Sequence, residues 1–146
     1  MTRALLVLLA AGGLATVDVP ADESKKDLER MQGDWAADSY VSDGMKVPDD
    51  DAQALFRTIK GDAYTVFRFR KVAGQGTMKL DASKKPKAID AFPAGSTGKP
   101  LLGIYEIDGD RLKLCFGGPG KDRPTAFTSE AGSSHVLSVW VREKKK

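Results

Sequence analysis

Nine short apolar segments, separated by turn-forming residues at near-regular intervals, constrain the fold of this chain more than any other feature. They are residues 35–41, 55–60, 63–70, 76–80, 87–92, 101–107, 111–116, 123–128 and 135–141. Each is rich in β-branched or aromatic residues, which is the pattern of a β-strand. Short connections between successive strands favour an up-and-down arrangement, and closure removes the exposed edges of the sheet. We therefore predict an all-β fold, an antiparallel up-and-down β-barrel of about eight to nine strands with one short helix.

The segment of residues 101–116 indicates which side chains face the inside of the barrel. Asp108-Gly109-Asp110 is typical of a hairpin turn, and the alternation of apolar residues agrees on both sides of it. One face of the hairpin carries Gly103, Tyr105, Ile107, Leu112, Leu114 and Phe116. The other face carries charged residues together with Ile104 and Cys115. We expect the first face to be the core side.

A second predicted hairpin turns at residues 60–62. It places Ile59, Tyr64 and Val66 on one face and leaves Phe67 and Phe69 on the opposite face, for which the sequence offers no explanation. Before this hairpin, residues 48–56 predict the short helix, with acidic side chains at its positive N-terminal end. Such a helix has room to lie across a barrel mouth.

The 146 residues divide into a predicted leader and one domain. Residues 1–21 begin with a positive charge and continue as an apolar run that ends in small residues, the pattern of a signal peptide. That run is shorter than the roughly 20 apolar residues of a membrane-spanning helix. Residues 22–30 are charged and predict a linker or one helical turn, residues 31–143 form the barrel domain, and residues 144–146 form a basic tail. We expect an exported protein, periplasmic or extracellular, with no membrane span after cleavage.

The charge pattern argues against a nucleic-acid partner. The formal net charge is +3, and three of the positive charges are the lysines of the tail. No basic stripe interleaved with aromatic residues occurs elsewhere, so we expect no nucleic-acid binding.

Gly33-Asp34-Trp35, at the start of the first predicted strand, and Arg142, after the last, resemble the lipocalin pattern of Gly-x-Trp with a late arginine packed over the tryptophan. Further stretches resemble the uncharacterised lipocalin-like domain family of planctomycete bacteria. They are residues 43–44, 59–62, 85–90, 103–110, 114–116 and 123–125. The resemblance implies a secreted or periplasmic lipocalin-like barrel closed by Gly33, Trp35 and Arg142. It implies no established activity and no catalytic residues.

Catalytic groups are sparse in this sequence. His135 is the only histidine and Cys115 the only cysteine, and neither has the neighbours of a nucleophile with its base or of a metal site. We expect no enzyme activity, no metal and no cofactor. Three states remain open for Cys115: a thiol packed under the short helix or a loop, an intermolecular disulfide, or a reactive thiol.

Four aromatic residues at inward positions are the candidates for ligand binding, because barrel mouths lined by aromatic residues are common binding sites. They are Trp35, Tyr64, Tyr105 and Phe116. We expect a small apolar or amphipathic ligand within the barrel. The alternative is that these residues fill the barrel, and that the domain is a structural or protein-interaction module of the cell envelope that uses residues 117–123 or Phe67 and Phe69.

Overall fold

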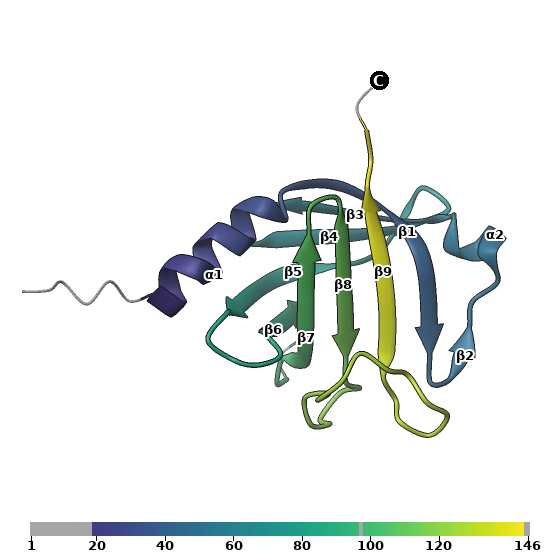
Figure 1. Cartoon of the computed structure of the whole chain (residues 1–146). Coiled ribbons are helices and arrows are strands. Elements are labelled where there is room, and N and C mark those ends of the chain that lie inside the picture. The colour runs from purple at the N-terminus through teal and green to yellow at the C-terminus, as the bar shows by residue number, and fades with distance from the viewer. Residues whose placement is uncertain (1–18, 97, 145–146) are drawn as a thin grey trace, which may run out of the picture.

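The computed structural model describes residues 19–96 and 98–144, and within them an antiparallel sheet closes into a barrel (Figure 1). The strands are β1 (Gly33–Ser42), β2 (Met45–Lys46), β3 (Leu55–Lys60), β4 (Ala63–Arg68), β5 (Lys71–Asp81), β6 (Ala88–Pro93), β7 (Leu101–Asp108), β8 (Arg111–Phe116) and β9 (Val136–Arg142). Pairing follows the order β1-β3-β4-β5-β6-β7-β8-β9, and β9 pairs back onto β1. The two-residue β2 pairs only with the end of β1. The predicted lipocalin-like, up-and-down barrel is confirmed.

The prediction of a strand over residues 123–128 is wrong. These residues belong to the long connection between β8 and β9, and they lie on the outside of the barrel without strand structure. The Arg123 guanidinium donates hydrogen bonds to the carbonyl oxygens of Ile89 and Gly103, at 3.1 and 2.7 Å, and pairs with Asp90 at 2.7 Å. Because β8 already pairs with β7 and β9, it offers this segment no free edge.

The segment predicted as a linker or single turn is a helix, α1 (Val19–Arg30), that lies against one end of the barrel (Figure 1). The helix is mostly polar because only a narrow strip of its surface packs against the barrel. Asp27 is fully buried, Leu28 packs against the core, and Met31, directly after the helix, is buried within it. The predicted leader boundary at residue 21 falls within α1, and residues 1–18 lie outside the described part of the chain.

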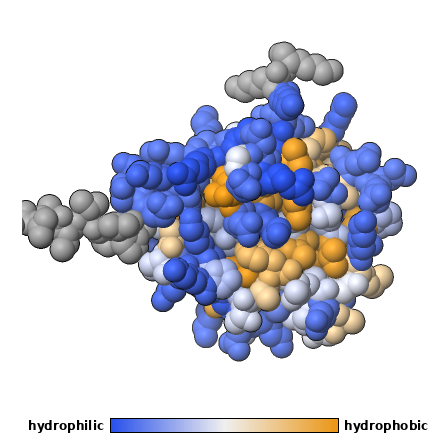
Figure 2. Space-filling view, viewed as in Figure 1, coloured by the Kyte–Doolittle hydropathy of each residue, from blue (hydrophilic) through white to orange (hydrophobic). Residues whose placement is uncertain are grey.

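The predicted short helix is present as α2 (Asp49–Ala52), with acidic residues in its first turn. Phe67 and Phe69 point away from the core, as the register of the second hairpin predicts, and Phe69 is exposed. Figure 2 shows apolar surface in the middle of one face of the molecule, ringed by hydrophilic side chains.

The inward face predicted for β7 and β8 is also confirmed. Tyr105, Ile107, Leu112, Leu114 and Phe116 all belong to the core or pack against it. Other core members come from strands around the barrel; they are Trp35, Ala37, Leu55, Ile59, Met78, Ile89 and Trp140.

Cys115 lies on the outward face of β8 but is buried. Its sulfur lies 3.4 Å from the carbonyl oxygen of Thr128, in the loop that covers the barrel wall here. The packed thiol is therefore the state the structure shows, and burial raises its pKa. A raised pKa disfavours the reactive thiolate.

Candidate functional site

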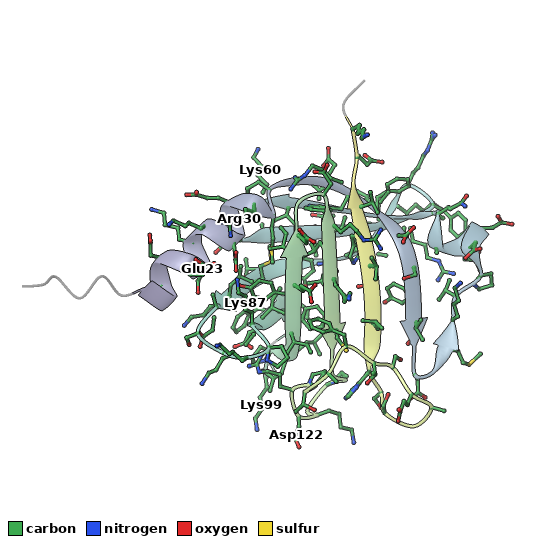
Figure 3. All side chains as sticks on the ribbon, in the orientation of Figure 1. Glu23, Arg30, Lys60, Lys87, Lys99 and Asp122 are labelled. Atoms are coloured by element: carbon green, nitrogen blue, oxygen red, sulfur yellow. The ribbon has the colours of Figure 1, made fainter. Side chains whose placement is uncertain are left out.

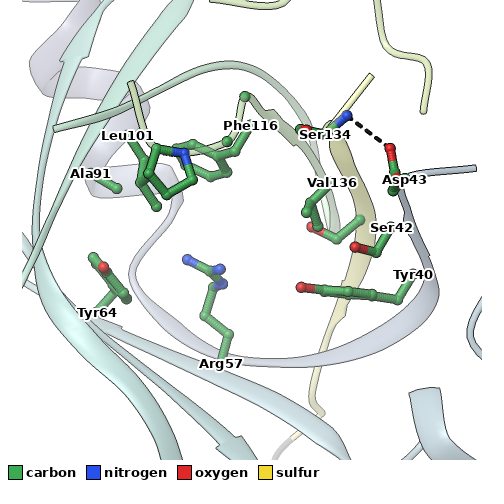
Figure 4. Close-up of a pocket in the computed structure, with 14 residues that line it drawn as sticks. Tyr40, Ser42, Asp43, Arg57, Tyr64, Ala91, Leu101, Phe116, Ser134 and Val136 are labelled. Carbon is green, nitrogen blue, oxygen red and sulfur yellow. Dashed lines mark hydrogen bonds between the residues drawn. The ribbon is translucent and has the colours of Figure 1, made fainter. Parts of the chain in front are cut away.

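The barrel is filled at the end that α1 covers and hollow at the other end. A cavity of about 480 Å³ opens at the hollow end, where β1 finishes and β7 and β9 begin (Figure 4). Its walls are contributed by nearly every strand of the barrel. The lining residues are Tyr40, Ser42, Asp43, Arg57, Tyr64, Ala91, Leu101, Phe116, Gly117, Gly118, Pro119, Ser134, Val136 and Ser138.

A second cavity of about 340 Å³ adjoins the first on the side of α2. Both cavities are bounded by Tyr40 and Arg57, while Leu55, Val66 and Trp140 form the apolar walls of the smaller one. The two hollows therefore share Tyr40 and Arg57 as a common boundary inside the barrel.

Arg57 is the charged side chain at this boundary, and Figure 4 shows its guanidinium near the middle of the larger cavity. Its guanidinium carbon lies 5.4 Å from the centre of the Tyr64 ring and 5.0 Å from that of Trp140, within range of cation–π attraction. Its Nε atom is buried without a hydrogen-bond partner. Burial lowers the pKa of Arg57 to about 10, against the smaller opposing effects of Tyr64 and Tyr40. The side chain therefore stays positively charged at neutral pH.

Tyr40 and Tyr64 bring hydroxyl groups to the same cavity (Figure 4). Burial raises the pKa of both phenols, although the charge of Arg57 acts in the opposite direction on each. Both therefore remain neutral and able to donate a hydrogen bond at neutral pH.

The rim of the larger cavity is held by hydrogen bonds between the β1–β2 turn and the loop before β9. The Asp43 carboxylate accepts a hydrogen bond of 2.9 Å from the backbone N–H of Ser134 (Figure 4). The backbone N–H of Asp43 donates to the carbonyl oxygen of His135, also at 2.9 Å. Asp43 thus holds the β1–β2 turn against the loop before β9 at the rim of the cavity.

The structure separates the four aromatic residues predicted from the sequence. Tyr64 and Phe116 line the cavity. Trp35 and Tyr105 instead lie buried in the filled end, where the Trp35 indole donates to the carbonyl oxygen of Met31 at 2.9 Å and the Tyr105 hydroxyl donates to Asp27 at 2.7 Å. Two of the four residues therefore border the cavity, and the other two belong to the packed core.

Neither Tyr40 nor Arg57 was predicted from the sequence. Arg57 carried a signal, because it alternates with Leu55 and Ile59 on the inward face of β3, where a charge is unexpected. The sequence carries no such signal for Tyr40. Strict alternation from the inward-facing Trp35 and Ala37 would place Tyr40 on the outward face, but a β-bulge after Ala37 shifts the register and places it on the inward face.

Gly33, Trp35 and Arg142 meet where the barrel adjoins α1. The Arg142 guanidinium carbon lies 4.2 Å from the centre of the Trp35 ring, and its nitrogens donate to the carbonyl oxygens of Gln32 and Arg30. Gly33 has φ of +117°, and a Cβ there would come within 3.2 Å of Arg142 Nη1. Arg142 thus packs over Trp35 and joins β9 to the segment that follows α1.

No family model, curated protein or solved structure matches the chain. Function is therefore inferred from the barrel and from the residues that line its cavity.

Among the described residues, no three histidine, cysteine or acidic side chains stand together as potential metal ligands, and no helix has the length and apolar character to span a membrane. The hydrogen bonds of His135 are made by its backbone, with Ser129, Ser133 and Asp43.

Proposed function

We propose that the protein is an exported, non-enzymatic lipocalin-like binding protein that holds a small amphipathic molecule in the hollow end of its barrel. The observation that carries this proposal is the cavity of about 480 Å³, which lies within the ~300–1,000 Å³ typical of small-molecule sites.

The composition of the cavity wall supports an amphipathic ligand. Ala91, Leu101, Phe116 and Val136 provide apolar surface, and the polar groups are few and specifically placed. Binding sites for small molecules combine these two features, with apolar area giving affinity and a few polar groups fixing orientation.

The alternative, an envelope interaction module with a filled barrel, has less support. Packed side chains fill the end that α1 covers, but the cavities shared by Tyr40 and Arg57 lie in the other end. Phe69 and Val72 are both exposed at the β4–β5 hairpin, yet much of any protein surface is apolar, so these side chains alone do not indicate an interface.

The test is a titration with N-phenyl-1-naphthylamine, a neutral apolar dye. It compares the native protein with variants at two positions of β9, one facing the cavity and one facing outward. Val136 lines the cavity, while Val139 pairs across the barrel wall with Lys113 on the outward face. We expect saturable binding to the native protein, at least a 10-fold loss in Val136→Trp because the indole occupies the cavity, and little change in Val139→Trp.

Absence of saturable binding to the native protein would overturn the proposal. Equal affinity of the two variants would do the same, since it would place the dye outside the barrel. Circular dichroism of both variants establishes that each still folds.

A further inference from the structure

A charged side chain lies inside each end of the barrel, and only one of these charges is paired with an opposite charge. At the filled end, Asp27 is fully buried, and it accepts hydrogen bonds of 2.8 Å from Lys87 and Arg30 and of 2.7 Å from Tyr105. Figure 3 shows Lys87 beside α1, whose last turn carries Arg30. At the hollow end, Arg57 has no carboxylate partner among the described residues.

Arg57 is partly buried, with its Nε atom fully so, and burial of an uncompensated charge is costly, so a cation without a carboxylate partner inside a barrel requires an explanation. The rings of Tyr64 and Trp140 lie within cation–π range of the guanidinium and offset part of this cost. They leave its hydrogen-bond donors unused, and in the described part of the chain Arg57 Nε is the only buried side-chain nitrogen or oxygen without a partner. The cavity in front of the guanidinium is where an acceptor would have to lie.

The acidic residues near the cavities do not supply that acceptor. Asp43 lies at the rim, where its carboxylate accepts from the backbone of Ser134. Asp51 lines only the smaller cavity, which a second guanidinium, that of Arg68, also lines. Among the described residues that line the larger cavity, Arg57 is therefore a positive charge without a carboxylate partner.

We propose that Arg57 binds the acid group of the ligand, which makes that ligand an amphipathic carboxylate; this inference rests on the proposed binding function. A guanidinium presents parallel N–H donors that match the two oxygens of a carboxylate. The hydroxyl groups of Tyr40 and Tyr64 provide neutral donors on either side (Figure 4).

The position of Arg57 also orients the ligand. Arg57 lies in the middle of β3, whereas Leu101, Phe116 and Val136 lie at strand ends closer to the rim. The carboxylate therefore enters first, and the apolar chain extends along these three side chains toward the mouth.

The test compares decanoate, decanol and decyltrimethylammonium, which share one alkyl chain and differ in head-group charge. Isothermal titration calorimetry with the native protein at neutral pH should show decanoate binding about 10-fold or more tightly than decanol, and decyltrimethylammonium most weakly. Arg57→Gln should weaken decanoate binding about 10- to 100-fold and leave decanol binding nearly unchanged. Arg111→Gln, a change on the outer surface where Arg111 pairs with Asp38, is the control and should alter neither.

The outcomes separate this inference from the function on which it rests. Equal binding of decanoate and decanol, or decanoate binding that survives Arg57→Gln, overturns the inference and leaves the cavity as a binding site. Parallel loss of decanoate and decanol in Arg57→Gln also overturns it, because the contribution of Arg57 would then not depend on charge. Absence of binding by all three probes, together with absence of dye binding, overturns both proposals.

Discussion

Asp27 shows how one side chain fastens α1 to the barrel. Its carboxylate has no solvent exposure and joins α1 to Lys87 beside β6 and to Tyr105 of β7. Burial raises the pKa of Asp27, but the hydrogen bonds from Lys87 and Tyr105, with the charge of Lys87 and a bond from Arg30, lower it by more. The pKa of Asp27 therefore lies below its usual value, and the ionised form stabilises the folded state.

Asp27→Asn is expected to lower the free energy of unfolding by about 1–3 kcal/mol at neutral pH. The loss stays moderate because Lys87 and Arg30 are partly exposed and regain water. Since the pKa is lowered on folding, this stabilisation is present above the unfolded-state pKa of about 4 and disappears as the pH falls through the folded-state value. Urea unfolding of both proteins at neutral and acidic pH should show the difference shrinking in acid.

Asp22→Asn is the control for this experiment, because Asp22 forms an exposed pair with Lys26 at 3.5 Å. Its effect should stay within about 0.5 kcal/mol. A difference between native protein and Asp27→Asn that persists or grows in acid would contradict the assigned role of the carboxylate.

Individual residues were predictable from the sequence where strict alternation holds. The inward positions of Tyr64, Tyr105 and Phe116 follow from their hairpins. The sequence did not predict which of these residues lie in the core and which line the cavity, because that depends on which end of the barrel α1 covers. Tyr40 was hidden by the bulge in β1.

At the scale of elements, Arg142 of β9 joins the barrel to the end of α1. Its guanidinium lies over Trp35 and donates to the carbonyl oxygens of Arg30 and Gln32, at the C-terminal end of the helix. Carbonyl groups at this end lack partners within a helix, so a cationic donor stabilises them. One side chain thus secures both the closing strand and the helix that covers the barrel.

Arg142→Lys is expected to destabilise the protein by about 1 kcal/mol and to loosen the last turn of α1. An ammonium group keeps the charge but lacks the planar fork that reaches two carbonyl oxygens while lying over the Trp35 ring. Hydrogen exchange should therefore quicken in the amides near Arg30 and change little in β7. Arg111→Lys, which changes an exposed ion pair, is the matched control. Equal exchange rates near Arg30 in the two variants would contradict the role of Arg142 in holding the end of α1.

The strands were predictable because each combines β-forming residues with a distinct turn, as at Asp108-Gly109-Asp110. The false strand over residues 123–128 has a similar composition, but the barrel provides no free edge to pair with it. α1 was missed for the opposite reason. Its sequence is predominantly polar, and its attachment depends on distant groups such as Tyr105 and Arg142 that no local pattern reveals.

At the scale of the molecule, the barrel combines a packed half with a hollow half. Trp35, Tyr105 and Ile89 are almost fully buried at the α1 end, whereas Leu101 and Phe116 border empty volume at the other. Truncating a packed core side chain creates a new cavity, and its cost grows with that cavity. A side chain that already borders a cavity leaves less new empty space when it is shortened. Stability and ligand affinity should therefore depend on different residues.

The paired variants Ile89→Ala and Leu101→Ala test this division. Ile89→Ala should lower the free energy of unfolding by about 2–5 kcal/mol, because Ile89 is 1% exposed within the core, and should change dye affinity less than about 2-fold. Leu101→Ala should cost about 1 kcal/mol or less and weaken dye and decanoate binding several-fold, because it removes part of the cavity wall. Urea unfolding and ligand titration measure the two effects on the same samples. If Ile89→Ala impaired binding as strongly as Leu101→Ala, the two halves would be coupled, and the filled end would be part of the ligand site rather than the support that holds it.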